Sequence, residues 1–279
     1  MAHSPALAEI DRLDPVADHE RIVLLSCRQD FPFDTTRALE LALFRTFAVP
    51  SIGGLLAATG EFERRAQRRY DDTDLLVSEL MEHGYTSERG QRALARINDL
   101  HGRFKIRNDD FLYVLATFVY VPIDWNARFG WRRLTEKELA AWFAFWRGVG
   151  AGMGIREIPS TSAALEAFMR GYEREQYRRD DASVRVALAT RELFVGWAPR
   201  PLRGFARRAI HALLDSPLRA AFGLPTPSRF LAWLVPAALR ARAMALRVLP
   251  RRRRPLLRTS LRPRSHPDGY VIERLGPEA

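Results

Sequence analysis

Apolar residues recur along most of the chain at steps of three and four, the spacing of a helix that packs one face inward. The stretch 87–104 shows this spacing at four positions: Leu94, Ile97, His101 and Phe104. The alternation with a period of two that indicates strands does not persist, and no internal repeat occurs. The pattern therefore predicts an all-α protein of about ten helices.

Capping signals mark where two of these helices begin. Ser87 has the side chain of a helix cap, and it stands directly before the apolar stripe of 87–104. Thr135 and Glu138 form the spacing of a capping box, in which each side chain bonds to the backbone of the other residue. This box predicts the start of a helix over 139–146.

Two apolar stretches bear on the core and on its interruptions. Residues 111–121 are apolar nearly all round, which predicts a central buried helix, and a loop is expected after it over 123–130. The stretch 230–249 mixes apolar residues with arginines, and Pro236 is expected to interrupt it.

His101 is a lone histidine on an apolar helical stripe. A neutral imidazole in that position must either find hydrogen-bond partners or bind a metal. Buried histidines are usually only hydrogen-bonded, so the pattern alone leaves both interpretations open. An arginine on a neighbouring helix would favour a binding role, because it could reach an anionic group beside the histidine.

Such an arginine occurs one helix upstream. Arg69 and Thr73 are four residues apart, so on a helix they share one face. Leu76 and Leu80 continue that face, which indicates that it turns inward. The alternative is a solvated surface helix, since charged residues are frequent from Glu61 to Arg69.

Composition indicates a folded globular chain. The 279 residues are 28% charged and 47% hydrophobic, which excludes the disordered class. The single cysteine, Cys27, excludes a disulfide framework and a cysteine-rich metal site. No signal peptide is visible, and no apolar run reaches the ~18–20 residues of a membrane span. The expected location is therefore the cytoplasm, either free or at a membrane surface.

Positive charge is concentrated in the last quarter of the chain. Residues 200–279 hold 17 arginines and 4 acidic residues, a net charge of +13. The whole chain carries +11, so residues 1–199 carry a net charge of −2. We expect a loose tail over 1–20, a helical domain over 21–250 and a basic tail over 251–279 that packs back on the body. The basic region is either a solvated tail or a contact to anionic membrane. Specific nucleic-acid binding is not expected, because no aromatic residues interleave the arginines of 251–264.

Several reaction classes lack their motifs. The chain has no glycine-rich nucleotide loop, no His-Glu-x-x-His zinc pair and no Gly-x-Ser-x-Gly nucleophile elbow. A di-iron bundle needs two Glu-x-x-His pairs, and the position three before His101 is Asn98. A single histidine in a helical protein instead favours haem, whose iron one proximal histidine can hold.

A family resemblance rests on the order of several short motifs. They are Arg69-x-x-x-Thr73, Asn98-Asp-Leu-His101-Gly, Asn108-Asp-Asp-Phe-Leu-Tyr-Val-Leu, Gly130-Trp-Arg-x-Leu-Thr-x-x-Glu138, Met153-Gly-Ile-x-x-Ile-Pro159 and the ending Pro267-Asp-Gly-Tyr-x-Ile-x-x-Leu-Gly-Pro277. In this order the chain resembles the MpaB-type oxygenases, and we interpret it as a bacterial member. That family includes the latex-clearing rubber oxygenases and the fungal membrane-bound oxygenase of mycophenolic acid biosynthesis.

The resemblance implies a globin-like helical core with additional peripheral helices, holding haem b. His101 matches the proximal iron ligand of the rubber oxygenases, and Arg69 and Thr73 match their distal residues. The implied activity uses O2 as co-substrate to oxidise or cleave a hydrophobic small molecule or a polyisoprenoid. Asp72 stands where rubber oxygenases can carry a lysine. Their acidic catalytic residue has no clear counterpart, and Glu61 lies near the region but out of place.

Two other functions remain as alternatives. One is a haem-free helical binding or structural protein, in which His101 is a core residue with satisfied hydrogen bonds. The other is a peripheral membrane protein that uses the basic C-terminal region. Haem content separates the first from an oxygenase, and salt-dependent binding to anionic vesicles identifies the second.

Overall fold

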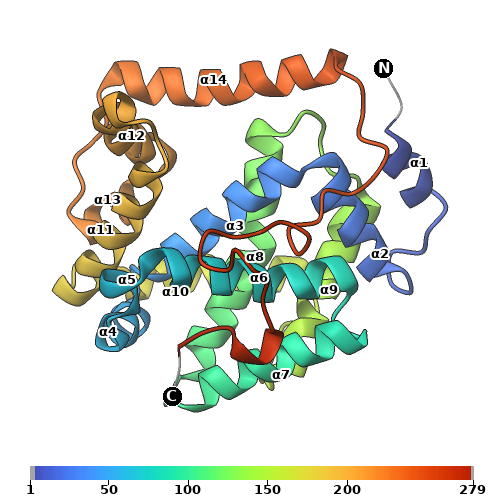
Figure 1. Ribbon diagram of the computed structural model, residues 1–279, viewed down its shortest axis with the longest axis horizontal. Coiled ribbons are helices and arrows are strands. Elements are labelled where there is room, and N and C mark those ends of the chain that lie inside the picture. The colour runs from blue at the N-terminus through green and yellow to red at the C-terminus, as the bar shows by residue number, and fades with distance from the viewer. Residues whose placement is uncertain (1–3, 278–279) are drawn as a thin grey trace.

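The computed structural model describes residues 4–277, and these form helices and connecting segments without any β-strand (Figure 1). The prediction of an all-α protein is therefore confirmed. The longer helices are α3 (Pro32–Thr46), α4 (Pro50–Thr59), α6 (Ala66–His83), α7 (Glu88–Gly102), α8 (Asn108–Phe129), α9 (Glu136–Gly152), α10 (Ser162–Gln176), α11 (Asp181–Gly196) and α14 (Arg229–Val248). The shorter ones are α1 (Pro5–Ile10), α2 (His19–Leu24), α5 (Glu61–Arg64), α12 (Arg203–Ala209) and α13 (Ser216–Phe222). Four short helices of other types complete the described part. They are the π-helix η1 (Leu25–Asp30) and the 3-10 helices η2 (Arg200–Leu202), η3 (Ile210–Leu213) and η4 (Ile272–Arg274).

The central element is α8, which packs against α3, α9 and α10. Its residues Tyr113, Ala116 and Val119 are completely buried, as expected for the apolar stretch 111–121. The expected loop over 123–130 is wrong, because α8 continues as a helix to Phe129. The last two turns bury Trp125 and Phe129 against α3, and this packing outweighs the helix-breaking tendency of Pro122.

Pro236 likewise lies inside a continuous helix. α14 runs without a break from Arg229 to Val248, so the expected interruption is wrong. Leu231 and Ala243 are buried on the two sides of the proline, which holds both halves of the helix against the body. Much of the rest of α14 is exposed to solvent, where water can satisfy the carbonyl group that lacks its usual donor.

The N-terminal residues are ordered against the body. The sequence predicted a loose tail over 1–20, but Pro5–Ile10 form α1, and Ala6 and Ile10 are fully buried against Ile22 and Leu25. Residues 4–10 are therefore not a loose tail, contrary to the prediction, and residues 1–3 lie outside the described part. The tail was misjudged because its few apolar residues pack against a partner element that local composition does not reveal.

Two helices, α6 and α7, form an antiparallel hairpin with a tight turn. Ser87 caps α7 as predicted, since its side chain accepts a hydrogen bond from the backbone of Gly90. Gly84 has a φ of +82°, a backbone conformation that favours glycine. A Cβ atom at Gly90 would lie 1.9 Å from the carbonyl oxygen of Gly84, so the close approach of the two helix ends requires glycine there.

The C-terminal segment, residues 251–277, runs back over the hairpin (Figure 1). Arg258 bonds to both carboxylate oxygens of Asp74 on α6 at 2.8 and 2.7 Å. Further along, Arg92 on α7 pairs with Glu273 at 2.6 Å. The segment therefore fastens both helices of the hairpin, and residues 278–279 of the predicted basic tail lie outside the described part.

No single helix within residues 4–277 combines the length and apolar character needed to cross a bilayer. The pair formed by α3 and α4 would meet those criteria together, but the two helices are bent by 98° relative to each other.

Candidate functional site

The α6–α7 hairpin brings two of the predicted site residues together. α6 ends at His83 and α7 begins at Glu88, so a position near the start of α6 faces a position near the end of α7. Arg69 and His101 occupy such positions. They are close enough for the positive charge of Arg69 to lower the pKa of His101.

His101 lacks hydrogen-bond partners. Its Nδ1 atom is buried and accepts or donates no hydrogen bond, and no bond to Nε2 occurs within residues 4–277 either. The ring of Phe111, from the first turn of α8, lies edge-on against the imidazole with the two ring centroids 5.2 Å apart. Burial, and to a smaller extent Arg69, lowers the pKa of His101 to about 4. The imidazole is therefore neutral at ordinary pH and offers a ring nitrogen to an additional group.

Arg69 has unused hydrogen-bonding capacity. Its guanidinium lies 5.3 Å from the centroid of the Phe62 ring. No hydrogen bond or ion pair to this guanidinium occurs in the described part of the chain, although an arginine carries five N–H donors. Burial lowers the pKa of Arg69, and the negative charges of Asp72 and Glu61 oppose that shift. A cation in this state favours an anionic partner.

Thr73 follows Arg69 by one turn on the same face of α6. Its hydroxyl donates a hydrogen bond of 2.9 Å to the backbone oxygen of Arg69, so the proton is used within the helix while the oxygen can still accept. The structure thus places Arg69 and Thr73 on one half-buried face, as predicted. It shows no direct contact between Thr73 and His101.

The two acidic residues near Arg69 are engaged elsewhere. Asp72 lies 2.6 Å from Nε2 of His266, which belongs to the C-terminal segment. Glu61 is buried and pairs with Arg65 at 2.7 Å. Neither carboxylate contacts His101 in the residues that the structure describes. The sequence did not predict Phe62 and His266 as neighbours of the site. Phe111 belongs to the apolar stretch 111–121, which the sequence predicted as a buried helix.

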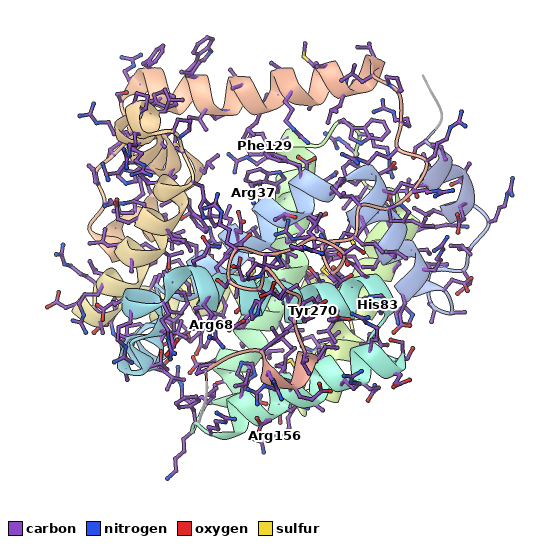
Figure 2. All side chains as sticks on the ribbon, in the orientation of Figure 1. Arg37, Arg68, His83, Phe129, Arg156 and Tyr270 are labelled. Carbon is purple, nitrogen blue, oxygen red and sulfur yellow. The ribbon has the colours of Figure 1, made fainter. Side chains whose placement is uncertain are left out.

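A basic groove of about 880 Å³ lies between α6, α7 and the C-terminal segment. Arg68 and Tyr270, both labelled in Figure 2, line it together with Arg96 and Arg103 of α7. Helical spacing places Arg96 and Arg103 two turns apart, on a side of α7 away from His101. The groove therefore borders the hairpin without containing Arg69, Thr73 or His101 in its lining.

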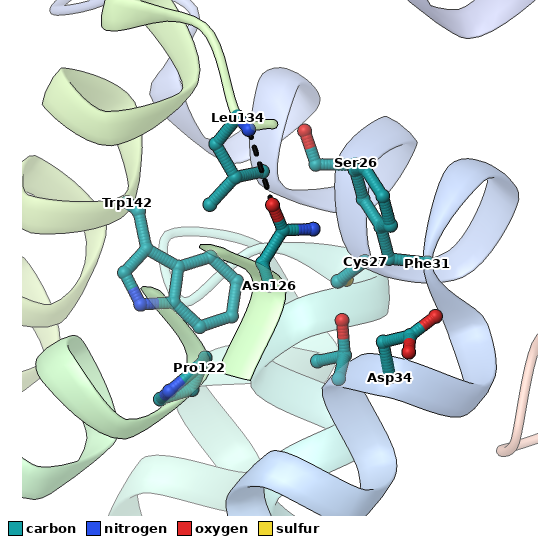
Figure 3. A pocket seen from close by; sticks show the side chains of 9 residues that line it. Ser26, Cys27, Phe31, Asp34, Pro122, Asn126, Leu134 and Trp142 are labelled. Atoms are coloured by element: carbon teal, nitrogen blue, oxygen red, sulfur yellow. Dashed lines mark hydrogen bonds between the residues drawn. The ribbon is translucent and has the colours of Figure 1, made fainter. Parts of the chain in front are cut away.

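A second, small cavity of about 20 Å³ lies beside η1, where Asn126 points toward Ser26 and Cys27 (Figure 3). The side-chain oxygen of Asn126 accepts a bond from the backbone of Leu134, but its nitrogen is buried without a partner. A volume of this size holds about one water molecule. The cavity can therefore solvate Asn126, but it is too small for a substrate.

Comparison with known proteins agrees with the motif order noted above. Residues 37–258 match the family model described as "ER-bound oxygenase mpaB/B'/Rubber oxygenase, catalytic domain". The chain is 39% identical over 132 residues to the ER-bound oxygenase mpaB of Penicillium roqueforti (strain FM164), covering 45% of this chain and 44% of that protein. It is 29% identical over 238 residues to the ER-bound oxygenase mpaB' of Penicillium brevicompactum, covering 79% and 56%.

The chain spans about half the length of the curated relatives that it matches. The family match itself covers most of the chain, from α3 to the start of the C-terminal segment, and includes the whole α6–α7 hairpin. The chain therefore belongs to the family of ER-bound oxygenase mpaB/B' and rubber oxygenase catalytic domains.

Proposed function

We propose that the protein is a haem-dependent oxygenase that uses O2 to oxidise a hydrophobic substrate, with its cofactor held at the α6–α7 hairpin. The observation that carries this proposal is the pairing of His101 and Arg69. His101 offers a neutral imidazole whose buried Nδ1 atom has no hydrogen-bond partner, and Arg69 offers a guanidinium without an ion pair in residues 4–277. Family membership supports an oxygenase on independent grounds.

The residues present fit haem b in their chemistry. Leaving a buried polar atom without a partner costs about 1–3 kcal/mol, so the orphaned nitrogen of His101 favours a ligand from outside the chain. A haem iron needs only one protein ligand on its proximal side. The ring of Phe111 provides an apolar surface beside the imidazole, as a porphyrin requires.

Each residue then has a distinct role. His101 would hold the iron through a ring nitrogen, and its low pKa keeps that nitrogen unprotonated. Haem would supply the binding and activation of O2. Arg69 is a preorganised cation that would stabilise negative charge developing on oxygen during the reaction. The Thr73 oxygen would accept a hydrogen bond and so orient a reacting group or a water molecule.

The proposed substrate is a hydrophobic molecule with carbon–carbon double bonds, such as an isoprenoid. Addition of one O2 across a double bond, with cleavage of that bond, gives two carbonyl groups, so the reaction balances without a reductant. "Rubber oxygenase" in the family description names such a substrate class for relatives of this chain. The carboxylates near Arg69, Glu61 and Asp72, are already paired with Arg65 and His266. Any proton that the reaction needs would therefore come from a water molecule or from the substrate.

An absorption spectrum tests the proposal. The protein, expressed with a haem precursor, is expected to purify with a Soret band and about one haem per chain. The coloured protein is then incubated with terpenoids and polyisoprenes, with O2 uptake and carbonyl products as readouts. A colourless protein that cannot be reconstituted with hemin would contradict haem dependence and favour a helical binding or structural protein.

Arg69→Gln is expected to keep the haem and slow the reaction. Gln removes the positive charge but retains a hydrogen-bonding side chain, so kcat should fall by about a hundredfold while the Soret band stays. The measurement is O2 consumption at saturating substrate. Arg64→Gln, an exposed arginine on α5, serves as the matched control and should leave kcat unchanged. Unchanged turnover in Arg69→Gln would remove Arg69 from the catalytic role.

A further inference from the structure

An unpartnered apolar face runs along the outside of α14. Residues 230, 233, 237, 241, 244 and 248 follow each other at steps of three and four, so they form one stripe on the helix. Its large side chains are exposed to solvent: Phe230 to 62%, Trp233 to 66%, Met244 to 63% and Val248 to 85%. The opposite side of the helix holds Leu231 and Ala243, which are buried. α14 is therefore apolar on two faces, and only one of them is used in the fold.

The surroundings of this stripe are strongly cationic. The chain has twelve arginines and no acidic residue between Asp215 and Asp268. Arg229 and Arg240 on α14 are exposed and make no ion pair in residues 4–277. Helical spacing places both on one flank of the stripe. By contrast, Arg242 on the inner side pairs with Asp34 at 3.1 Å and is already neutralised.

The position of α14 leaves the stripe open. The helix crosses one edge of the molecule (Figure 1), and its inner side contacts η3, α8 and α12. Leu202 and Phe205, on the neighbouring η2 and α12, are also exposed, to 53% and 47%. They are two further exposed apolar side chains on elements next to α14.

We propose that the outer face of α14, which we call the α14 face, docks on the surface of an anionic lipid bilayer. Aromatic side chains such as Trp233 and Phe230 favour the boundary between headgroups and acyl chains. Arginines on the flank of the stripe can bind lipid phosphate groups, and each adds about 1 kcal/mol of attraction near an anionic surface. The helix would lie in the plane of the membrane, with its inner side packed on the protein and its outer stripe along all 20 residues in contact with lipid.

Charge favours a lipid partner over a second copy of the chain. Two α14 faces brought together would place arginines of both copies side by side, with no carboxylate from this part of either chain to pair with them. Like charges at an interface oppose association. An anionic bilayer supplies both the apolar phase and the counter-charge.

The test is co-sedimentation of the full-length protein with vesicles. Binding is expected to vesicles of phosphatidylcholine with phosphatidylserine, to be much weaker on phosphatidylcholine alone, and to decrease as salt is raised. Phe230→Ser/Trp233→Ser should weaken binding by about tenfold or more, because two apolar side chains no longer enter the bilayer. Arg229→Gln/Arg240→Gln should weaken binding to the anionic vesicles only.

Matched controls change other faces of the molecule. Val16→Ser/Leu261→Ser removes two exposed apolar side chains outside the α14 face, and Arg156→Gln/Arg174→Gln removes the same charge elsewhere. Arg156 lies on the edge of the molecule opposite α14 (Figure 2). Both controls should bind like the parent. If Phe230→Ser/Trp233→Ser loses its helical circular dichroism, Met244→Ser/Val248→Ser replaces it.

Three results would overturn the proposal. One is equal binding of the parent to both kinds of vesicle. Another is parent-like binding by the Phe230→Ser/Trp233→Ser protein. The third is a parent protein that does not bind vesicles but forms a dimer in sedimentation analysis, when the Phe230→Ser/Trp233→Ser protein stays monomeric. That result would make the α14 face a protein interface.

Discussion

A His101→Ala variant is expected to purify without haem, with no Soret band above background. The proposed function assigns the proximal iron ligand to His101, and alanine would leave the iron with no protein ligand on that side. The measurement is the ratio of Soret to protein absorbance after expression with a haem precursor. Since the His101 side chain makes no hydrogen bond in residues 4–277, its loss should disturb the fold little, and the variant should retain its helical circular dichroism.

Two controls separate ligation from folding in this experiment. His211→Ala removes a buried histidine on η3, away from the hairpin, and should keep the parent's haem content. In His101→Gly, added imidazole should restore part of the Soret band, because it can occupy the space of the missing ring. A His101→Ala protein with full haem content would show that another residue holds the iron.

Arg28→Met is expected to lower the free energy of unfolding by about 3–5 kcal/mol, the range for removing one partner of a buried ion pair. Arg28 pairs with Glu82 at 2.5 Å, and their side chains are exposed to only 2% and 0%. Arg28 also donates to Ser78 at 2.9 Å. Methionine fills similar space but leaves the Glu82 carboxylate buried without its counter-charge. Denaturant unfolding followed by circular dichroism measures the loss.

A double-mutant cycle checks that the effect comes from the unpaired charge. Arg28→Met/Glu82→Gln removes both charges, so it should be less destabilised than the sum of the single variants. Arg21→Met, at a half-exposed pair with Glu9, should change stability by less than about 1 kcal/mol. If Arg28→Met also loses less than about 1 kcal/mol, the hydrogen bonds from the backbone N–H groups of Arg258 and Thr259 are sufficient to stabilise the Glu82 carboxylate.

Local signals in the sequence were sufficient to predict the two helices of the hairpin. Ser87 marked the start of α7, and the spacing of Arg69 and His101 placed both on inward faces of neighbouring helices. The spacing of the residues could not predict that the His101 side chain lacks a hydrogen-bond partner. That His101 is unpartnered depends on which side chains from α6 and α8 surround it, and only the folded structure shows this.

The predictions that α8 ends near Pro122 and that Pro236 interrupts α14 were both wrong, and the reason is physical. The rule that proline breaks a helix considers only the local backbone. In α8, the burial of Trp125 and Phe129 against α3 stabilises the helix beyond Pro122. Tertiary packing of this kind is invisible in a local pattern. The same limitation applies to α1, where Ala6 and Ile10 find their partners in α2 and η1.

The fastening of the hairpin by the C-terminal segment has a kinetic consequence. The bond of Arg258 to Asp74 joins residues 184 apart in sequence, and that of Arg92 to Glu273 joins residues 181 apart. Closing loops of that length has a large entropic cost, so such contacts form late, whereas α6 and α7 are joined by a short turn and can pair early. The hairpin that carries Arg69 and His101 is therefore an early, local folding unit, and the segment that holds it against the body is among the last to be put in place.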